Sequence, residues 1–137
     1  MSTTGHIGNE KYVSFTSVKR NGEEVSLPVW IVQLSPSEVA FTSEGNAWKV
    51  RRVRANAHVS LQPCDFRGRV LEGSATVHGT ARVVTPQENP QDLATVEKAV
   101  KKKYGIVARF VNVSSFLKGV FRRQESNDAA IIVRLSL

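Results

Sequence analysis

Residues 38–62, EVAFTSEGNAWKVRRVRANAHVSLQ, decide the fold, because they predict a strand, a short basic helix and a second strand in succession. Val39 and Phe41 alternate with smaller or polar neighbours, which is the period-two pattern of a half-buried strand. Val50 and Val53 then stand three residues apart and predict the apolar stripe of a helix. A helix placed between two strands in this way indicates a sheet that bends around it.

The start of this helix gathers hydroxyl, amide and cationic side chains. Thr42, Ser43 and Asn46 stand where residues that cap a helix commonly stand. Four cations follow within six residues, with no acid among them: Lys49, Arg51, Arg52 and Arg54. Free N–H groups, hydroxyls and cations at one helix start are typical of a phosphate site. The alternative is a basic helix face that is simply solvated, and the residues alone leave both interpretations open.

Apolar and polar residues also alternate in five segments outside this stretch or overlapping its end. They predict strands over residues 11–19, 24–34, 58–65, 72–84 and 129–137. Asn21-Gly22 is a strong hairpin signal between the first two, since both residues tolerate positive φ. Pro28 cannot donate to a β-ladder, so the strand that holds it is expected at a sheet edge or at a bulge.

A helical insert is expected before the last strand. Pro90 suits the first turn of a helix whose apolar stripe has helical spacing: Leu93, Val96, Val100 and Tyr104. Gly105 is expected to end or kink that helix. Residues 106–123 then suggest one or two short helices.

Together these elements predict a mainly β protein with helical insertions, six antiparallel strands and a sheet that closes into a small barrel. A length of 137 residues fits one domain over residues 1–137, with residues 1–10 expected to form a loose terminus.

Composition narrows the environment and the partners. No apolar run approaches the roughly 20 residues that a transmembrane helix needs, and the start of the chain lacks the apolar core of a signal peptide. A cytoplasmic protein without a membrane span is therefore expected. The net charge of +7 favours anionic partners, and the single Cys64 fits a reducing compartment.

Catalytic side chains are sparse. His6, His58 and His78 lack the short spacings of a metal site and are expected to face solvent, while Cys64 is expected to be buried and inert. Any chemistry would therefore come from a bound cofactor. Trp30 and Trp48 could each stack on a planar ring or serve as ordinary core or interface aromatics.

A second basic region, residues 98–123, holds eight cations and no acid. It could be a solvated helix face, a contact for nucleic acid or acidic membrane, or a contact for the anionic tail of a long cofactor. Nucleic acid is not expected as a partner, because no recognised binding motif is present.

Several stretches resemble the flavin/deazaflavin oxidoreductases, the pyridoxamine 5'-phosphate oxidase-like split β-barrel family. KYVSFTSVKRNGEEVSLPVWIV at 11–32 is similar to the first hairpin of the branch described as F420-dependent, and residues 38–70 are similar to its cofactor-binding segment. GSATVHGTARVV at 73–84 resembles a long later strand of that branch. KKKYGIVARF at 101–110 and FLKGVFRR at 116–123 resemble its late helical insert.

The resemblance implies a homodimer with two cofactor sites at the subunit interface and a small-molecule substrate. It implies that Lys49 and Arg51 hold the cofactor phosphate, helped by Thr42 and Ser43, while residues 26–30 border the ring. The expected cofactor-binding set is Ser26, Pro28, Trp30, Thr42, Ser43, Asn46, Lys49 and Arg51. No catalytic side chain is assigned.

Three functions follow from this reading. The first is an F420-dependent oxidoreductase that transfers a hydride between the deazaflavin and a small conjugated substrate. The second keeps the fold and uses FMN, as a flavin oxidase or a flavin-binding protein. The third is a non-enzymatic module that binds polyanions through the cationic surface.

Overall fold

The computed structural model describes residues 7–43, 45, 47–110 and 129–136. Nine elements lie in this part of the chain: β1 (Tyr12–Val18), β2 (Glu24–Trp30), β3 (Val32–Ser35), β4 (Glu38–Ser43), α2 (Trp48–Ala55), β5 (His58–Cys64), β6 (Val77–Val84), α3 (Pro90–Phe110) and β7 (Ala129–Leu135). The strands form one antiparallel sheet in the order β2-β1-β5-β6-β7-β4-β3. The mainly β prediction is confirmed, but the sheet has seven strands and not six.

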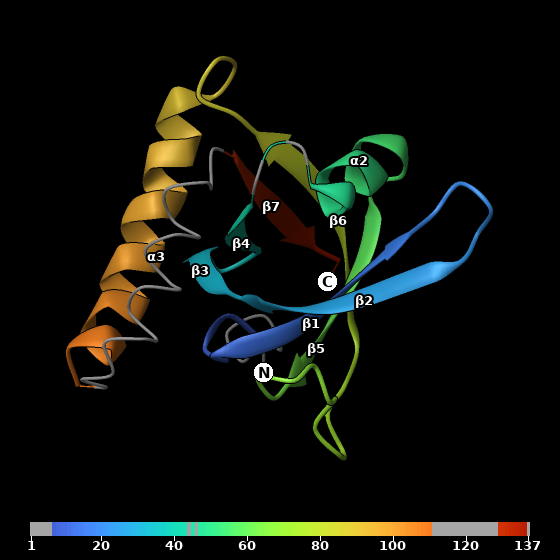
Figure 1. Cartoon of the computed structure of the whole chain (residues 1–137), viewed down its shortest axis with the longest axis horizontal. Helices are drawn as coiled ribbons and strands as arrows, with labels where there is room; N and C mark the ends of the chain where they lie inside the picture. Colours follow the sequence, from blue (N-terminus) through green and yellow to red (C-terminus); the bar gives the residue numbers. More distant parts are fainter. Residues whose placement is uncertain (1–6, 44, 46, 111–128, 137) are drawn as a thin grey trace.

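The additional strand arises where the predicted strand 24–34 breaks at Ile31. β2 and β3 lie at opposite edges of the sheet, yet Ile31 is the only residue between them. The sheet must therefore curl until its two edges meet at this residue, which gives the strongly curved half-barrel of Figure 1. A continuous alternation of apolar residues does not reveal such a break, because the break is imposed by closure of the sheet.

The first hairpin follows its sequence signals. Gly22 has a φ of 87° and its N–H donates to the Lys19 carbonyl, so the turn between β1 and β2 uses the freedom of glycine. Pro28 lies opposite Ser14 on β2, which pairs only with β1. The edge position predicted for the proline is confirmed.

Two layers of apolar side chains hold the fold. Inside the barrel, Phe15 and Phe41 meet edge to face with ring centroids 4.8 Å apart, and Val50 and Val53 of α2 close the same cluster. Outside it, the predicted stripe of α3 packs on β3, β4 and β7. Figure 1 shows α3 along one side of the barrel and α2 on the other.

Helix α3 continues through Gly105 to Phe110. Of the two alternatives predicted for Gly105, the end of the helix is therefore wrong. A glycine inside a helix costs about 1 kcal/mol relative to alanine, which the rest of a long helix can absorb. The remainder of the predicted short helices, residues 111–123, lies outside the described residues.

The corner at Ile31 is held by two consecutive residues of α3. Lys103 Nζ donates to the Ile31 carbonyl at 2.7 Å and also to the carbonyls of Gly8 and Glu10. Tyr104 Oη donates to the same Ile31 carbonyl at 2.6 Å. Residues 7–10 are consequently fixed to the barrel and not loose, whereas residues 1–6 lie outside the described part.

No helix in the described part of the chain combines the length and apolar character needed to cross a membrane.

Lys103, at this corner, makes the free energy of unfolding depend on pH. Burial lowers the pKa of Lys103 from 10.5 to about 8, and the nearby Glu10 carboxylate opposes that shift. Above pH 8 the folded protein releases a proton that the unfolded chain keeps, so the free energy of unfolding is expected to rise as the pH increases towards 10. Lys103→Met should remove this rise. Urea unfolding at a series of pH values measures it.

Lys102→Met is the matched control, because Lys102 is the exposed neighbour on the same helix. Burial raises the pKa of Tyr104, which acts in the opposite direction above pH 10, so the comparison belongs between pH 8 and 10. An equal slope in the two variants would contradict the role assigned to Lys103.

Candidate functional site

Helix α2 carries the cations that the sequence singled out. It begins at Trp48 after the N-cap residue Ala47, and its first turn contains no acid. The N-cap position is held by Ala47, which makes no side-chain cap hydrogen bond, so neither Thr42 nor Ser43 is the N-cap residue. Both residues instead belong to β4, where they pair with Ala130 and Ala129. Asn46 lies outside the described residues.

Strand alternation separates the two hydroxyl residues. Ser43 is buried on the face of β4 that also presents Phe41 to the barrel interior, where α2 packs. Thr42 lies on the other face of β4, the face on which Ala40 packs against α3. Ser43 therefore shares the interior side with α2, whereas Thr42 lies on the opposite face of β4.

The four cations of α2 have different surroundings. Arg52 Nε donates to the buried Ser17 hydroxyl of β1 at 2.8 Å, which fastens the helix to the barrel. Lys49 is half-buried, and Arg51 and Arg54 are exposed. Lys49 and Arg51 are thus the cations at the helix start, whereas Arg52 and Arg54 lie in the last turn.

The two tryptophans also have different surroundings. Trp30 is stacked on Tyr104 with ring centroids 4.5 Å apart and 14° between the planes, so its role is packing against α3. Trp48, at the start of α2, is 69% exposed, with the Arg51 guanidinium 5.0 Å from its ring centroid. Of the two, Trp48 is the one that presents a ring to solvent.

The remaining predicted residues lie on β2, away from the interior. Ser26 and Pro28 are exposed, and the Ser26 hydroxyl hydrogen-bonds to Thr16 Oγ1 at 2.6 Å. Both share the outer face with Trp30. The structure therefore groups Ser43, Lys49 and Arg51 around α2, and places Ser26, Pro28, Trp30 and Thr42 on the outer face.

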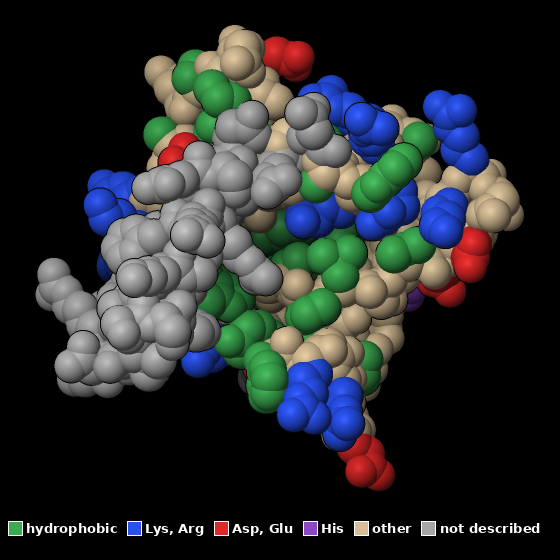
Figure 2. Space-filling model, viewed as in Figure 1, with side chains coloured by type: hydrophobic (Ala, Val, Ile, Leu, Met, Phe, Trp, Pro, Cys, Tyr) green, Lys and Arg blue, Asp and Glu red, His purple; other side chains and the backbone are tan. Residues whose placement is uncertain are grey.

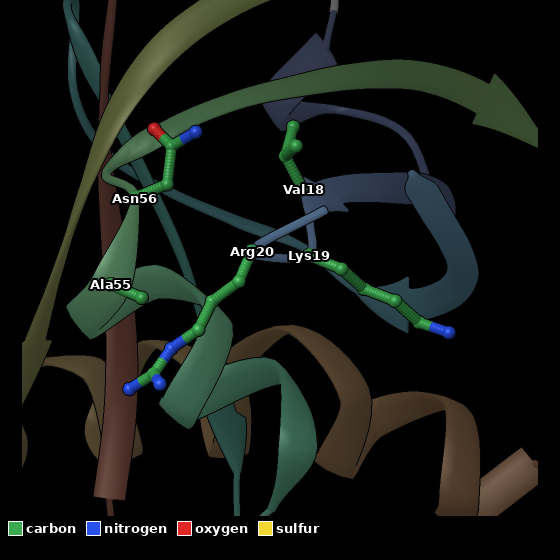
Figure 3. A pocket seen from close by; sticks show the side chains of 5 residues that line it. All are labelled: Val18, Lys19, Arg20, Ala55 and Asn56. Carbon is green, nitrogen blue, oxygen red and sulfur yellow. The ribbon is translucent and has the colours of Figure 1, made fainter. Parts of the chain in front are cut away.

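A hollow of about 280 Å³ lies at the opposite end of α2, lined by Val18, Lys19, Arg20, Ala55 and Asn56. Figure 3 shows the Arg20 side chain running along α2 while Lys19 extends away from it. The C-terminal end of a helix carries partial negative charge, which disfavours a bound anion there. This hollow is therefore a poorer phosphate site than the helix start.

Sequence reasoning missed a second cationic feature, the hairpin tip at residues 63–71. Its turn carries Phe66, Arg67 and Arg69, and it is closed by a β-bridge between Cys64 and Val70. The stretch was interpreted only as a turn. The available signal was the run of one aromatic, two basic and one glycine residue in four consecutive positions, 66–69.

The predictions for single residues are largely confirmed around the site. His58 and His78 are exposed strand residues, and Cys64 is buried. Burial raises the pKa of the Cys64 thiol, and the Asp65 carboxylate adds to that rise. A thiol with a raised pKa is a weak nucleophile at neutral pH, in agreement with an inert cysteine.

Comparison with solved structures identifies the fold. The chain is similar to Group A Streptococcus HupZ, with a TM-score of 0.64 and 12% identity over 99% of this chain and 89% of that one. It is also similar to a putative pyridoxamine 5'-phosphate oxidase from Listeria innocua, with a TM-score of 0.62 and 16% identity over 97% and 90% of the two chains.

A third solved structure, an F420 reductase, matches with a TM-score of 0.54 and 15% identity over 96% of this chain and 92% of that one. No protein-family model and no curated protein matches the chain. The structural neighbours include pyridoxamine 5'-phosphate oxidase-like split-barrel proteins, and at these identities the likeness shows the fold alone.

The contact between Arg52 and Ser17 predicts a loss of stability. Arg52→Met removes a donor from a buried hydroxyl, which is expected to lower the free energy of unfolding by about 1–3 kcal/mol. Arg54→Met removes an exposed cation from the same turn and should change it by less than about 0.5 kcal/mol. Urea denaturation of both variants checks this, and equal losses would show that Arg52 does not fasten the helix.

Proposed function

We propose that the chain is an oxidoreductase that binds the deazaflavin F420 with its phosphate at the start of α2. The observation that carries the proposal is the pair Lys49 and Arg51 in the first turn of a helix that has no acid there and whose N-cap residue is Ala47. The split-barrel fold, shared with an F420 reductase among other proteins, supports a redox cofactor.

The donor set at this helix start suits a phosphate. Partial positive charge from the helix start adds to the two cations of its first turn. The Ser43 side chain ends the neighbouring strand on the same side of the sheet. A doubly charged group is the ligand that gains most from this combination.

The protein's own contribution would be binding, orientation and exclusion of water. F420, when bound, supplies hydride chemistry at its ring, and the substrate would be a small conjugated molecule. Lys49 and Arg51 would fix one end of the cofactor and so limit where its ring can lie. No side chain of the described residues is assigned a proton-transfer role.

We also propose that the protein works as a homodimer. Figure 2 shows hydrophobic side chains gathered in the middle of one face, with Lys and Arg side chains over α2 above them and over the β5–β6 loop below them. An apolar centre within a polar rim is typical of a protein–protein interface.

FMN is the second candidate cofactor, because it also carries a phosphate and a putative pyridoxamine 5'-phosphate oxidase shares the fold. A polyanion-binding module without catalysis is the third, supported by the net charge of +7. It predicts an affinity that falls linearly with salt on a logarithmic plot.

Fluorescence titration of the purified protein with F420, FMN and a DNA duplex separates the three. F420 binding that is much tighter than FMN binding supports the first function, and the reverse order supports the second. Binding of DNA at physiological salt, with neither cofactor bound, would remove the enzymatic proposal.

Lys49→Ala is expected to weaken cofactor binding by about 1.5–3 kcal/mol, since one charged hydrogen-bond partner of the phosphate is lost. Arg54→Ala removes a cation from the other end of the same helix and should leave the affinity within about twofold, because an exposed charge at that distance is screened. The same titration measures both. An unchanged affinity in Lys49→Ala would show that the phosphate binds elsewhere.

A further inference from the structure

Two histidines that are far apart in the sequence lie on neighbouring strands of the sheet. The antiparallel register of β5 and β6 pairs His58 with Thr80 and Ser60 with His78. Directly paired residues share a face of a sheet, and so do residues two positions apart on one strand. His58 and His78 are therefore diagonal neighbours on one face.

That face is the outer face of the barrel. Val59 and Leu61 of β5 and Ala81 of β6 point the other way and belong to the interior cluster, whereas His58 and His78 are exposed. Diagonal neighbours on antiparallel strands are about 7–8 Å apart, a distance that aromatic and long side chains can bridge. The two imidazoles can consequently converge on one atom between them.

A hollow of about 120 Å³ joins the two histidines. Thr16 of β1, Glu24 of β2 and Ser60 of β5 are among the residues that line it together with His58 and His78. Thr16 pairs with Ser60, so β1 continues the same outer face beside β5. The hollow thus provides space for a small ligand where the register brings the imidazoles together.

The backbone that carries the pair is held on both strands. The His58 N–H donates to Asn56 Oδ1 at 3.0 Å, and the His78 carbonyl accepts from the Ser136 N–H at 2.8 Å. Side chains on paired strands are positioned more precisely than side chains on loops. Only the exposed imidazole rings must turn when a ligand binds between them.

The groups around the hollow favour a cation over an anion. Among the described residues, neither the imidazoles nor the Glu24 carboxylate forms an ion pair within 4.0 Å. A neutral imidazole keeps one nitrogen lone pair for a ligand. The Glu24 charge opposes an anion here, although the whole chain has a net charge of +7.

An imidazole pair also selects the kind of cation. Imidazole nitrogen suits Cu²⁺, Ni²⁺ and Zn²⁺, whereas Mg²⁺ and Ca²⁺ prefer oxygen ligands. No three His, Cys, Asp or Glu side chains in the described ranges are grouped so that they could hold a metal ion. Glu24 therefore contributes charge and not a coordinating oxygen.

We propose that His58 and His78 bind one divalent transition metal ion on the outer face of the sheet. The two imidazoles are its protein ligands, and its other coordination positions are open to water or to a donor atom of another molecule. Cu²⁺ binds more tightly than Zn²⁺, as expected for nitrogen ligands. The site does not depend on the proposed cofactor, whose phosphate is assigned to the start of α2.

Calorimetric titration of the purified protein with Cu²⁺ and with Zn²⁺, without added cofactor, tests the proposal. The wild type should bind one ion per chain at micromolar metal. His58→Gln and His78→Gln should each weaken binding by at least about tenfold, because the second imidazole acts at a high effective concentration once the first is bound. His6→Gln is the matched control, since it removes the third histidine of the chain and should leave the affinity unchanged.

Paramagnetic broadening of NMR signals locates the ion without any substitution. Substoichiometric Cu²⁺ should first broaden the amide signals of residues 58–60 and 78–80, and EDTA should restore them. Both histidines are exposed, so the glutamine variants should keep the wild-type fold, and circular dichroism checks this.

Several results would overturn the proposal. They are an absence of binding at micromolar metal, an affinity that either glutamine variant leaves unchanged, and a loss of binding in His6→Gln. Broadening centred on Cys64 or on the start of α2 would also overturn it, because the ion would then be bound elsewhere. Binding of F420 or FMN, or its absence, bears on the proposed function alone.

Discussion

The backbone carbonyl of Ile31 is the point on which the arrangement of the barrel depends. Ile31 is buried and lies between two edge strands, so its carbonyl stands outside both strands. A buried carbonyl without a donor costs free energy comparable to a lost hydrogen bond. Lys103 and Tyr104 both supply donors, and the stacking of Tyr104 on Trp30 holds them in place. Closure of the sheet is thereby tied to the docking of α3.

Closure of the sheet also determines which side chains of α2 face the barrel interior and which face outward. Because the sheet curls, Val50 and Val53 reach the interior cluster, and Arg52 reaches Ser17 on β1. These contacts fix the rotation of a helix only eight residues long. Lys49 and Arg51 therefore owe their positions at the helix start to this packing. The cationic site is a consequence of barrel geometry.

Local patterns in the sequence predicted most of the fold but only part of the site. The Asn21-Gly22 turn, the edge position of Pro28 and the stripe of α3 each depend on a few neighbouring residues, and each is confirmed. The break at Ile31 could not be predicted, since Ile31 continues the alternation of Val29 and only long-range closure interrupts it. Thr42 and Ser43 resembled caps in sequence, but pairing with β7 extends the strand through them and turns them to opposite faces.

The two exposed regions, the start of α2 and the hairpin tip, are difficult to explain separately. Exposed aromatic rings alone would favour association, while a net excess of cations alone would oppose it and favour solubility. A small protein that exposes both gains most when a partner covers the rings and an anion neutralises the charges at the same time. The proposed homodimer with an anionic redox cofactor would satisfy both requirements.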